Sequence, residues 1–359
     1  MFGFFKKKNK RQLYIKLDRA FCEQSAKNNS SISTQNDTPS QIQSRIDSPS
    51  IIENQPDFSW IDEHIKVQDD FPRIDWTEIG TALKKGIVKE SEMSSLSEFW
   101  STAVSKWLIQ LSNNLADEHE IYESEHFYIF SSASDSYLSI FIHYLESIQA
   151  RIFRSLKGIV QYNERGKFVV LVFENIELYY SYISHYYPED GEFAMSSGVF
   201  LSDGYGHFVV PHNELDHVEA VAAHELTHAM LAHLPIPAWL NEGLAVNMEA
   251  SITGYSSYQL NEQKHNKHLD YWDANSIQKF WSGDSFHHPG DASELSYHLA
   301  QLIVQSLAEE YEIFIQFVNQ ADFNDGGEAA AIKVFGGSLG AIIEQVYGEG
   351  DWSPKPDLW

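Results

Sequence analysis

The five residues from His224 to His228 read His-Glu-Leu-Thr-His, and they constrain this chain more than any other feature. Side chains four positions apart on an α-helix lie on the same face, about one turn from each other. His224 and His228 can therefore direct a ring nitrogen at the same ion, and Glu225 begins the same turn. The sequence thus predicts a helix that presents two metal ligands and a neighbouring carboxylate on one side.

The residues around this motif predict a helix that ends soon after it. Apolar residues recur at helical spacing through residues 215–233, and Pro235 and Pro237 then stop the helix. A second helix is predicted to begin near Trp239 and to run to about Met248. The apolar positions that define the first helix are Leu215, Val218, Val221, Ala222, Leu226, Ala229 and Met230.

A catalytic zinc needs three protein ligands and one open position, so two histidines are too few. Glu242 lies one turn into the second helix, in the string Trp-Leu-Asn-Glu-Gly-Leu-Ala. We expect it to be the third ligand. Glu249, two turns further on the same face, is the alternative, and a surface helix with merely solvated histidines is the remaining interpretation of the first motif.

These two motifs resemble those of the gluzincin zinc metallopeptidases, in particular the small peptidase MA-like group. The resemblance covers about residues 197–250 and extends more weakly to about residue 347. It implies that His224, His228 and Glu242 bind Zn²⁺ as the cofactor. The metzincin pattern is not matched, because it would need glycine and histidine at two positions that are leucine here, 231 and 234.

The resemblance also assigns roles in hydrolysis of a peptide bond. It implies that Glu225 is the general base, and that a tyrosine or histidine at the start of the long C-terminal helix stabilises the oxyanion. Tyr297 matches the family pattern there better than its neighbour His298. A non-cleaving, zinc-containing peptide-binding module and a hydrolase of a non-peptide amide remain the alternatives.

Two departures from related enzymes refine this interpretation. Zinc aminopeptidases carry a Gly-x-Met-Glu-Asn-type segment for the substrate amine, and the nearest string here, Glu192-Phe-Ala-Met-Ser196, does not match it. We therefore expect an endopeptidase, in which the edge strand of a hairpin over residues 199–211, expected to be His207–Pro211, pairs with an extended peptide. An ordinary structural hairpin is the alternative. Thermolysin-like enzymes have an aspartate four residues after the ligand glutamate, where this chain has Val246.

Charge and composition restrict the partners. The 359 residues carry a net charge of −26, although the first 23 residues alone carry +5. Such an acidic body repels phosphates, so we expect no nucleic-acid partner and a peptide or protein substrate instead. No apolar run is long enough to span a bilayer, and residues 1–11 do not form an ordinary signal peptide, although they could touch an anionic membrane surface. These features favour a cytoplasmic location.

The order of patterns along the chain predicts an α+β fold: a zincin-like, two-lobed metallopeptidase domain preceded by a helical segment and a disordered tail. Strands are expected at residues 127–130 and 167–173, with an amphipathic helix at residues 136–157 between them. The predicted divisions are residues 1–57 as basic tail and disordered linker, 58–118 as helical segment, 119–350 as metallopeptidase domain and 351–359 as irregular tail.

Two further histidine pairs, His265/His268 and His287/His288, lie among polar residues in apparent loops. They could bind a metal, but solvated surface positions are the simpler interpretation.

Overall fold

The computed structural model describes residues 44–45, 59–68, 71–84, 96–115, 119–162, 165–186, 198–201, 205–212, 215–255 and 261–359. Helices and β-strands are both present, so the fold class is α+β, as predicted. Its contacts divide the chain into two compact units. One contains the sheet and comprises Asn36–Ala150 and Gln161–Met230, and the other is helical and includes Arg151–Val160 and Leu231–Trp359.

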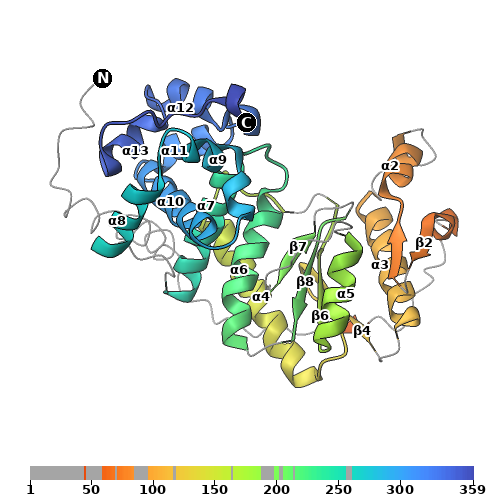
Figure 1. Ribbon diagram of the computed structural model, residues 1–359. Helices are drawn as coiled ribbons and strands as arrows, with labels where there is room; N and C mark the ends of the chain where they lie inside the picture. The colour runs from red at the N-terminus through yellow and green to blue at the C-terminus, as the bar shows by residue number, and fades with distance from the viewer. Residues whose placement is uncertain are drawn as a thin grey trace. The chain divides into compact units, whose positions relative to one another are not determined.

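A six-stranded mixed sheet forms the centre of the first unit (Figure 1). Strands β5, β6 and β8 are parallel to one another, and the pairings β1–β4, β4–β5 and β8–β7 are antiparallel. All six residues of β6 are buried, which explains its unbroken Phe-Val-Val-Leu-Val-Phe sequence. In sheet order the strands are β1 (Ser44–Arg45), β4 (Glu120–Glu123), β5 (Phe127–Ser131), β6 (Phe168–Phe173), β8 (His207–Pro211) and β7 (Val199–Leu201).

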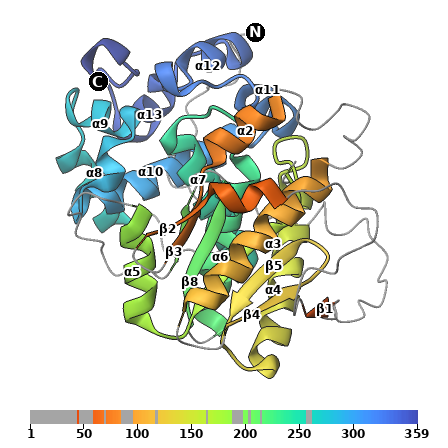
Figure 2. The same ribbon diagram turned by 90° about the vertical axis from the view of Figure 1, so that its right-hand side faces the viewer.

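Helices cover both faces of this sheet. In two perpendicular views, α3 and α5 lie on one face, and α4 and α6 lie on the other (Figures 1 and 2). Alternate strand residues such as Tyr128, Phe130 and Leu171 join one hydrophobic core with buried residues of α3 and α5. The helices are α3 (Leu96–Asn114), α4 (Asp135–Ser155), α5 (Ile176–Tyr186) and α6 (Leu215–Leu231).

A small hairpin completes the same core. Ile65–Gln68 (β2) pairs with Phe71–Ile74 (β3), and the indole nitrogen of Trp107 on α3 donates to the carbonyl of Pro72 at 2.9 Å. The 3-10 helix η1 (Ser59–His64) precedes the hairpin, and α2 (Trp76–Lys84) follows it.

The helical unit is built around two helices in close contact, α7 (Ala238–Thr253) and α10 (Asp291–Leu307). A Cβ atom on Gly243 of α7 would lie only 2.7 Å from the carbonyl oxygen of Ala300 on α10, so glycine permits this approach. The other helices are α8 (Glu262–Tyr271), α9 (Ser276–Ser282), η3 (Asp284–His287), α11 (Tyr311–Val318), η4 (Phe323–Asp325), α12 (Glu328–Phe335), α13 (Gly340–Tyr347) and η5 (Pro356–Leu358).

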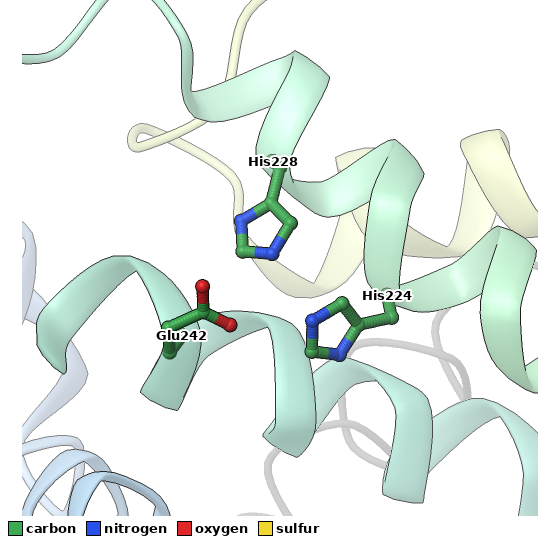
Figure 3. A group of neighbouring side chains, drawn as sticks. All are labelled: His224, His228 and Glu242. Atoms are coloured by element: carbon green, nitrogen blue, oxygen red, sulfur yellow. The ribbon is translucent and has the colours of Figure 1, made fainter. Parts of the chain in front are cut away.

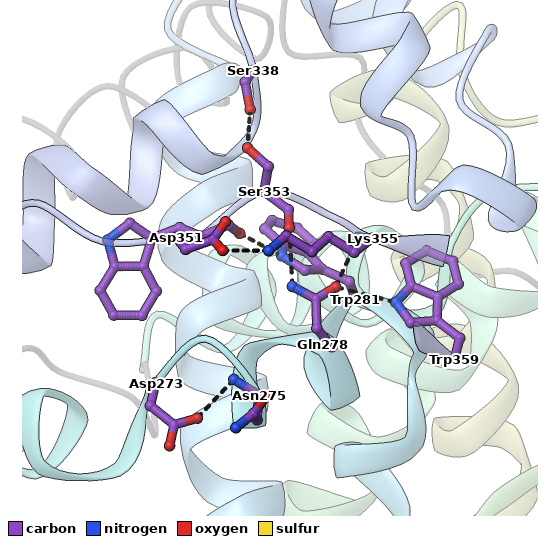
Figure 4. Close-up of polar contacts among 10 residues, drawn as sticks. Asp273, Asn275, Gln278, Trp281, Ser338, Asp351, Ser353, Lys355 and Trp359 are labelled. Atoms are coloured by element: carbon purple, nitrogen blue, oxygen red, sulfur yellow. Dashed lines mark hydrogen bonds and ion pairs between the residues drawn. The ribbon is translucent and has the colours of Figure 1, made fainter. Parts of the chain in front are cut away.

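The last residues of the chain are bound to α9 through the side chain of Gln278 (Figure 4). Its Nε2 donates to the carbonyl of Ser353 at 3.0 Å, and its Oε1 accepts from the backbone N–H of Lys355 at 2.8 Å and the indole N–H of Trp359 at 3.3 Å. Trp281, one turn later, donates to a backbone carbonyl of the same segment. This segment, predicted to be irregular, contains the short helix η5 and is fixed by side-chain contacts.

Several predicted elements agree with the structure and others differ. The strands at 127–130 and 167–173, the helix at 136–157 and the hairpin strands are present within one or two residues. Residues 85–95, inside the predicted helical segment 58–118, lie outside the described residues. Within the predicted disordered linker, two residues form β1, and the rest of 1–57 lies outside the described part.

Among the described residues, no single helix combines the length and apolar character of a membrane span; α12 and α13 meet those criteria only when counted together across an 83° bend.

Candidate metal centre

Helix α6 carries both histidines of the first motif on one side. The rings of His224 and His228 have centroids 4.7 Å apart, and both side chains are half-buried. The buried side of α6 consists of small and apolar residues, namely Ala222, Ala223, Leu226 and Met230. Thr227 is also fully buried, and its hydroxyl donates to the carbonyl of residue 223 at 2.7 Å, so no polar group there lacks a partner. The amphipathic pattern therefore fixes which side of α6 presents its imidazoles.

Helix α7 presents Glu242 one turn after it begins. Pro237 precedes the first turn, where it has no need of an N–H group. Trp239 anchors that turn: its side chain is fully buried, packs edge-on against Trp281 at 5.5 Å, and donates from Nε1 to the carbonyl of Gly326 at 2.9 Å. The packed indole of Trp239, three residues before Glu242, thus anchors the turn that carries Glu242.

Packing against α10 holds the following turn of α7. Besides the contact at Gly243, Asn247 is buried and donates from Nδ2 to the carbonyl of Gly243 at 2.7 Å and to that of Gln301 on α10 at 3.2 Å. The asparagine therefore cross-links the two helices beside the glutamate.

The structure brings the three predicted metal ligands together. Ligand atoms of His224, His228 and Glu242 all lie within 4.8 Å of one another, and the three side chains point toward a common space (Figure 3). Two atoms that each lie about 2.1 Å from a tetrahedral ion are about 3.4 Å apart, so small side-chain movements suffice to enclose one. Two imidazoles and one carboxylate are a donor set that suits zinc. The residues present therefore fit the metal that the motif implies.

Glu249, the alternative third ligand, is not part of this group. It lies seven residues after Glu242 on α7 and is half-buried. Within the described residues, the group of three is the one set of histidine, cysteine and acidic side chains whose atoms could hold a metal ion.

Glu225 is held by a backbone group of the sheet. Its Oε2 accepts a hydrogen bond from the N–H of Phe200 on β7 at 2.9 Å. A Cβ atom on Gly198, just before β7, would lie 2.6 Å from Val221 Cγ1 on α6, so the strand reaches the helix only because this residue is glycine. The sequence motif predicted the carboxylate, but a backbone donor has no residue-type signal and was missed.

The two candidate oxyanion donors occupy different environments on α10. Tyr297 is half-buried, and its ring meets that of Phe286 edge-on at 5.1 Å. His298 is fully buried, and its Nδ1 lies 2.7 Å from Nε2 of His268.

The prediction that His265 and His268 are solvated loop residues is wrong, because both lie on a helix and His268 is not solvated. Both lie on α8, where His268 is fully buried and accepts a hydrogen bond at Nδ1 from the indole N–H of Trp272 at 2.8 Å. A buried imidazole favours the neutral form, and desolvation lowers the pKa of His268 to about 3 and that of His298 to about 2, with the nearby Lys264 as a further cause. The other pair, His287 and His288, is exposed, as predicted.

The tautomers of this buried pair follow from the direction of the bonds. An indole N–H can only donate, so Nδ1 of His268 accepts and its proton lies on Nε2. Nε2 of His268 then donates to Nδ1 of His298. The neutral ring of His298 therefore carries its own proton on Nε2. Hydrogen-bond donation therefore runs in one direction, from Trp272 through His268 to His298, and both imidazoles are neutral.

The hairpin prediction is correct, but the expected edge strand is not. β8, His207–Pro211, pairs on both sides, in parallel with β6 and antiparallel with β7. In the described part of the sheet the edge beside α6 is β7, Val199–Leu201. Within the hairpin the chain forms the edge strand β7 first and the inner strand β8 second. A hairpin pattern in the sequence does not reveal this order.

Comparisons with protein-family models, curated proteins and solved structures found no match.

Proposed function

We propose that this protein is a zinc-dependent endopeptidase of the gluzincin type with a zincin-like fold. The observation that carries the proposal is the convergence of His224, His228 and Glu242 from two successive helices. A purely structural zinc site is usually closed by a fourth protein ligand, whereas the described residues supply three. A site with three ligands and an adjacent carboxylate is suited to hydrolysis.

Zinc bound by these residues would polarise the substrate carbonyl and lower the pKa of a coordinated water to about 7. Glu225 supplies the base. It takes a proton from the attacking water as the water oxygen bonds to the carbonyl carbon, and it returns that proton to the nitrogen as the C–N bond breaks. The products are a carboxylic acid and an amine, so atoms and protons balance.

Tyr297 is our candidate for the donor to the developing oxyanion. An oxyanion donor must contact substrate, and a fully buried side chain cannot do so, which favours half-buried Tyr297 over His298. The phenol O–H would donate to the oxygen that gains charge in the transition state.

Substrate class follows from the edge strand and the missing amine-binding segment. An extended peptide can add to β7 by backbone hydrogen bonds, which hold the middle of a chain without regard to its ends. An exopeptidase would instead need a carboxylate placed for the free amine, because a buried, unpaired ammonium is costly. The nearest candidate string, Glu192–Ser196, lies outside the described residues.

Metal analysis combined with a mixed peptide library tests the proposal. We expect about one zinc per chain, cleavage within peptides, and loss of cleavage in Glu225→Gln with zinc retained, since the amide keeps the shape but cannot accept a proton. Zinc binding without cleavage in the wild type would support a non-cleaving peptide-binding module, and cleavage of non-peptide amides alone would support the other alternative.

Acetylation of the substrate's N-terminus separates endopeptidase from aminopeptidase. Cleavage should survive the block, because backbone pairing does not use the terminal amine. Stepwise trimming of free peptides combined with resistance of acetylated ones would contradict this assignment.

A further inference from the structure

The backbone N–H of Phe200 occupies an unusual place in the sheet. In an antiparallel pair, successive residues point their N–H and C=O groups alternately toward and away from the partner strand. Phe200 faces Phe208 on β8, with Val199 and Leu201 on either side. Because its N–H reaches Glu225, it points away from β8, toward the side of β7 on which the described residues form no further strand.

Two independent features bring this donor to the carboxylate. One is the hydrogen bond itself, 2.9 Å from the Phe200 nitrogen to Oε2 of Glu225. The other is the glycine before the strand, since a Cβ at Gly198 would come 2.6 Å from Val221 and 3.0 Å from a methyl of Val210. Val221 lies one turn before Glu225 on α6, so Gly198 sets how closely β7 approaches the turn that carries the base.

We propose that the backbone N–H of Phe200 is a positioning group for Glu225. It fixes Oε2 of the carboxylate that acts as the base in the hydrolysis proposed above, on which this role rests. A charge-assisted hydrogen bond from a backbone amide is short and directional, and it restricts rotation of the carboxylate about its last bond.

The positioning has a consequence for how a peptide uses the edge. The Phe200 N–H is already bound, so a substrate strand that demanded this donor would compete with Glu225. A peptide that pairs with β7 while the base stays in place would instead donate to the carbonyl of Phe200, which points to the same side as its N–H. The role of Phe200 is therefore carried by its backbone, and its side chain is not required.

Hydrogen exchange measures the contact without any assay of activity. On the free edge of a sheet an amide exchanges rapidly unless it is bonded. Glu225→Ala should raise the exchange rate of the Phe200 amide at least tenfold in NMR spectra of the metal-loaded full chain, while the Val209 amide within the β7–β8 pairing stays unchanged. Equal rates for Phe200 in the wild type and Glu225→Ala would overturn the proposal.

A matched pair of variants tests the consequence for catalysis. Phe200→Pro removes the N–H, and an outward-facing N–H on an edge strand is where proline is tolerated. Phe200→Ala removes the same ring but keeps the donor. We expect Phe200→Pro to lower kcat at least tenfold with KM and zinc content unchanged, and Phe200→Ala to stay within about threefold of the wild type. Equal losses in both would overturn the role.

Failure of the two proposals can be told apart. If the wild type cleaves no peptide, the proposed function fails, while the exchange rates still decide whether Phe200 holds Glu225. If the wild type cleaves and the exchange rates do not respond to Glu225→Ala, the peptidase assignment stands and the positioning role fails.

Discussion

The buried imidazole pair His268–His298 should make the stability of this protein depend on pH. In the folded chain burial holds the pKa values of the two rings at about 3 and about 2, whereas an unfolded chain restores values near 6.5. Both rings are neutral in the folded state above pH 4, and both take up protons in the unfolded state as the pH falls below 6.5. Unfolding therefore becomes easier as the pH decreases through this window.

The magnitude follows from the size of the shift. When the pH falls from 7.5 to 5.5, protonation of each imidazole lowers the free energy of the unfolded state by about 1.4 kcal/mol. The folded state gains nothing, because its rings stay neutral over this range. The two rings together should remove about 2.7 kcal/mol from the free energy of unfolding. Neither ring is exposed, so solvent screening does not reduce this effect. Lys264 opposes protonation of both rings, while Glu294 favours it at His268 to a smaller degree.

Urea unfolding of the chelator-treated protein at pH 5.5, 6.5 and 7.5 measures the effect, with His268→Gln as the matched variant. Glutamine can accept from the Trp272 indole and donate to His298, but it does not titrate. Its loss of stability between pH 7.5 and 5.5 should be smaller than that of the wild type by about 1.4 kcal/mol. Equal losses in the two proteins, or a ring of the pair that titrates above pH 5 in NMR spectra of the folded chain, would refute the reasoning.

Three further changes test the packing and the chemistry around the site. Gly243→Ala forces a methyl group against α10 and should cost about 1–3 kcal/mol of stability and weaken zinc binding, as seen by chemical unfolding and metal titration; an unchanged zinc affinity would contradict the role of this close approach. Gln278→Ala removes three hydrogen bonds to the C-terminal segment and should cost about 2–3 kcal/mol in chemical unfolding, and an unchanged free energy of unfolding would contradict this role of the side chain. Tyr297→Phe should lower kcat about 100-fold at unchanged KM and zinc content, and an unaltered kcat would remove Tyr297 from the mechanism.

The sequence predicted that His224 and His228 lie together because their spacing is a property of the helix. Two histidines four residues apart share a face in any α-helix, and the prolines at 235 and 237 fix where the next helix can begin. The short connection leaves few ways to orient Glu242, so a local pattern was sufficient. The same holds for β6, whose continuous apolar run predicts a strand buried on both faces.

Contacts between residues distant in the chain were not predictable in this way. The burial of His268 depends on His298, thirty residues later, and on the packing of α8, whose polar sequence has the appearance of a loop. β7 lies at the edge because β8 pairs with β6 on its other side. This parallel pairing has no local signal in the sequence. Periodicity reports which face of an element is buried but not what covers it.

The sheet unit has a hydrophobic core of its own. Its buried members run from Ile61 to Val209. Small zinc-dependent domains unfold without their ion because the ion replaces a core, whereas this chain has a core of its own. Chelation should therefore yield a folded apoprotein, and cobalt could then be introduced in place of zinc as a spectroscopic probe of the coordination sphere.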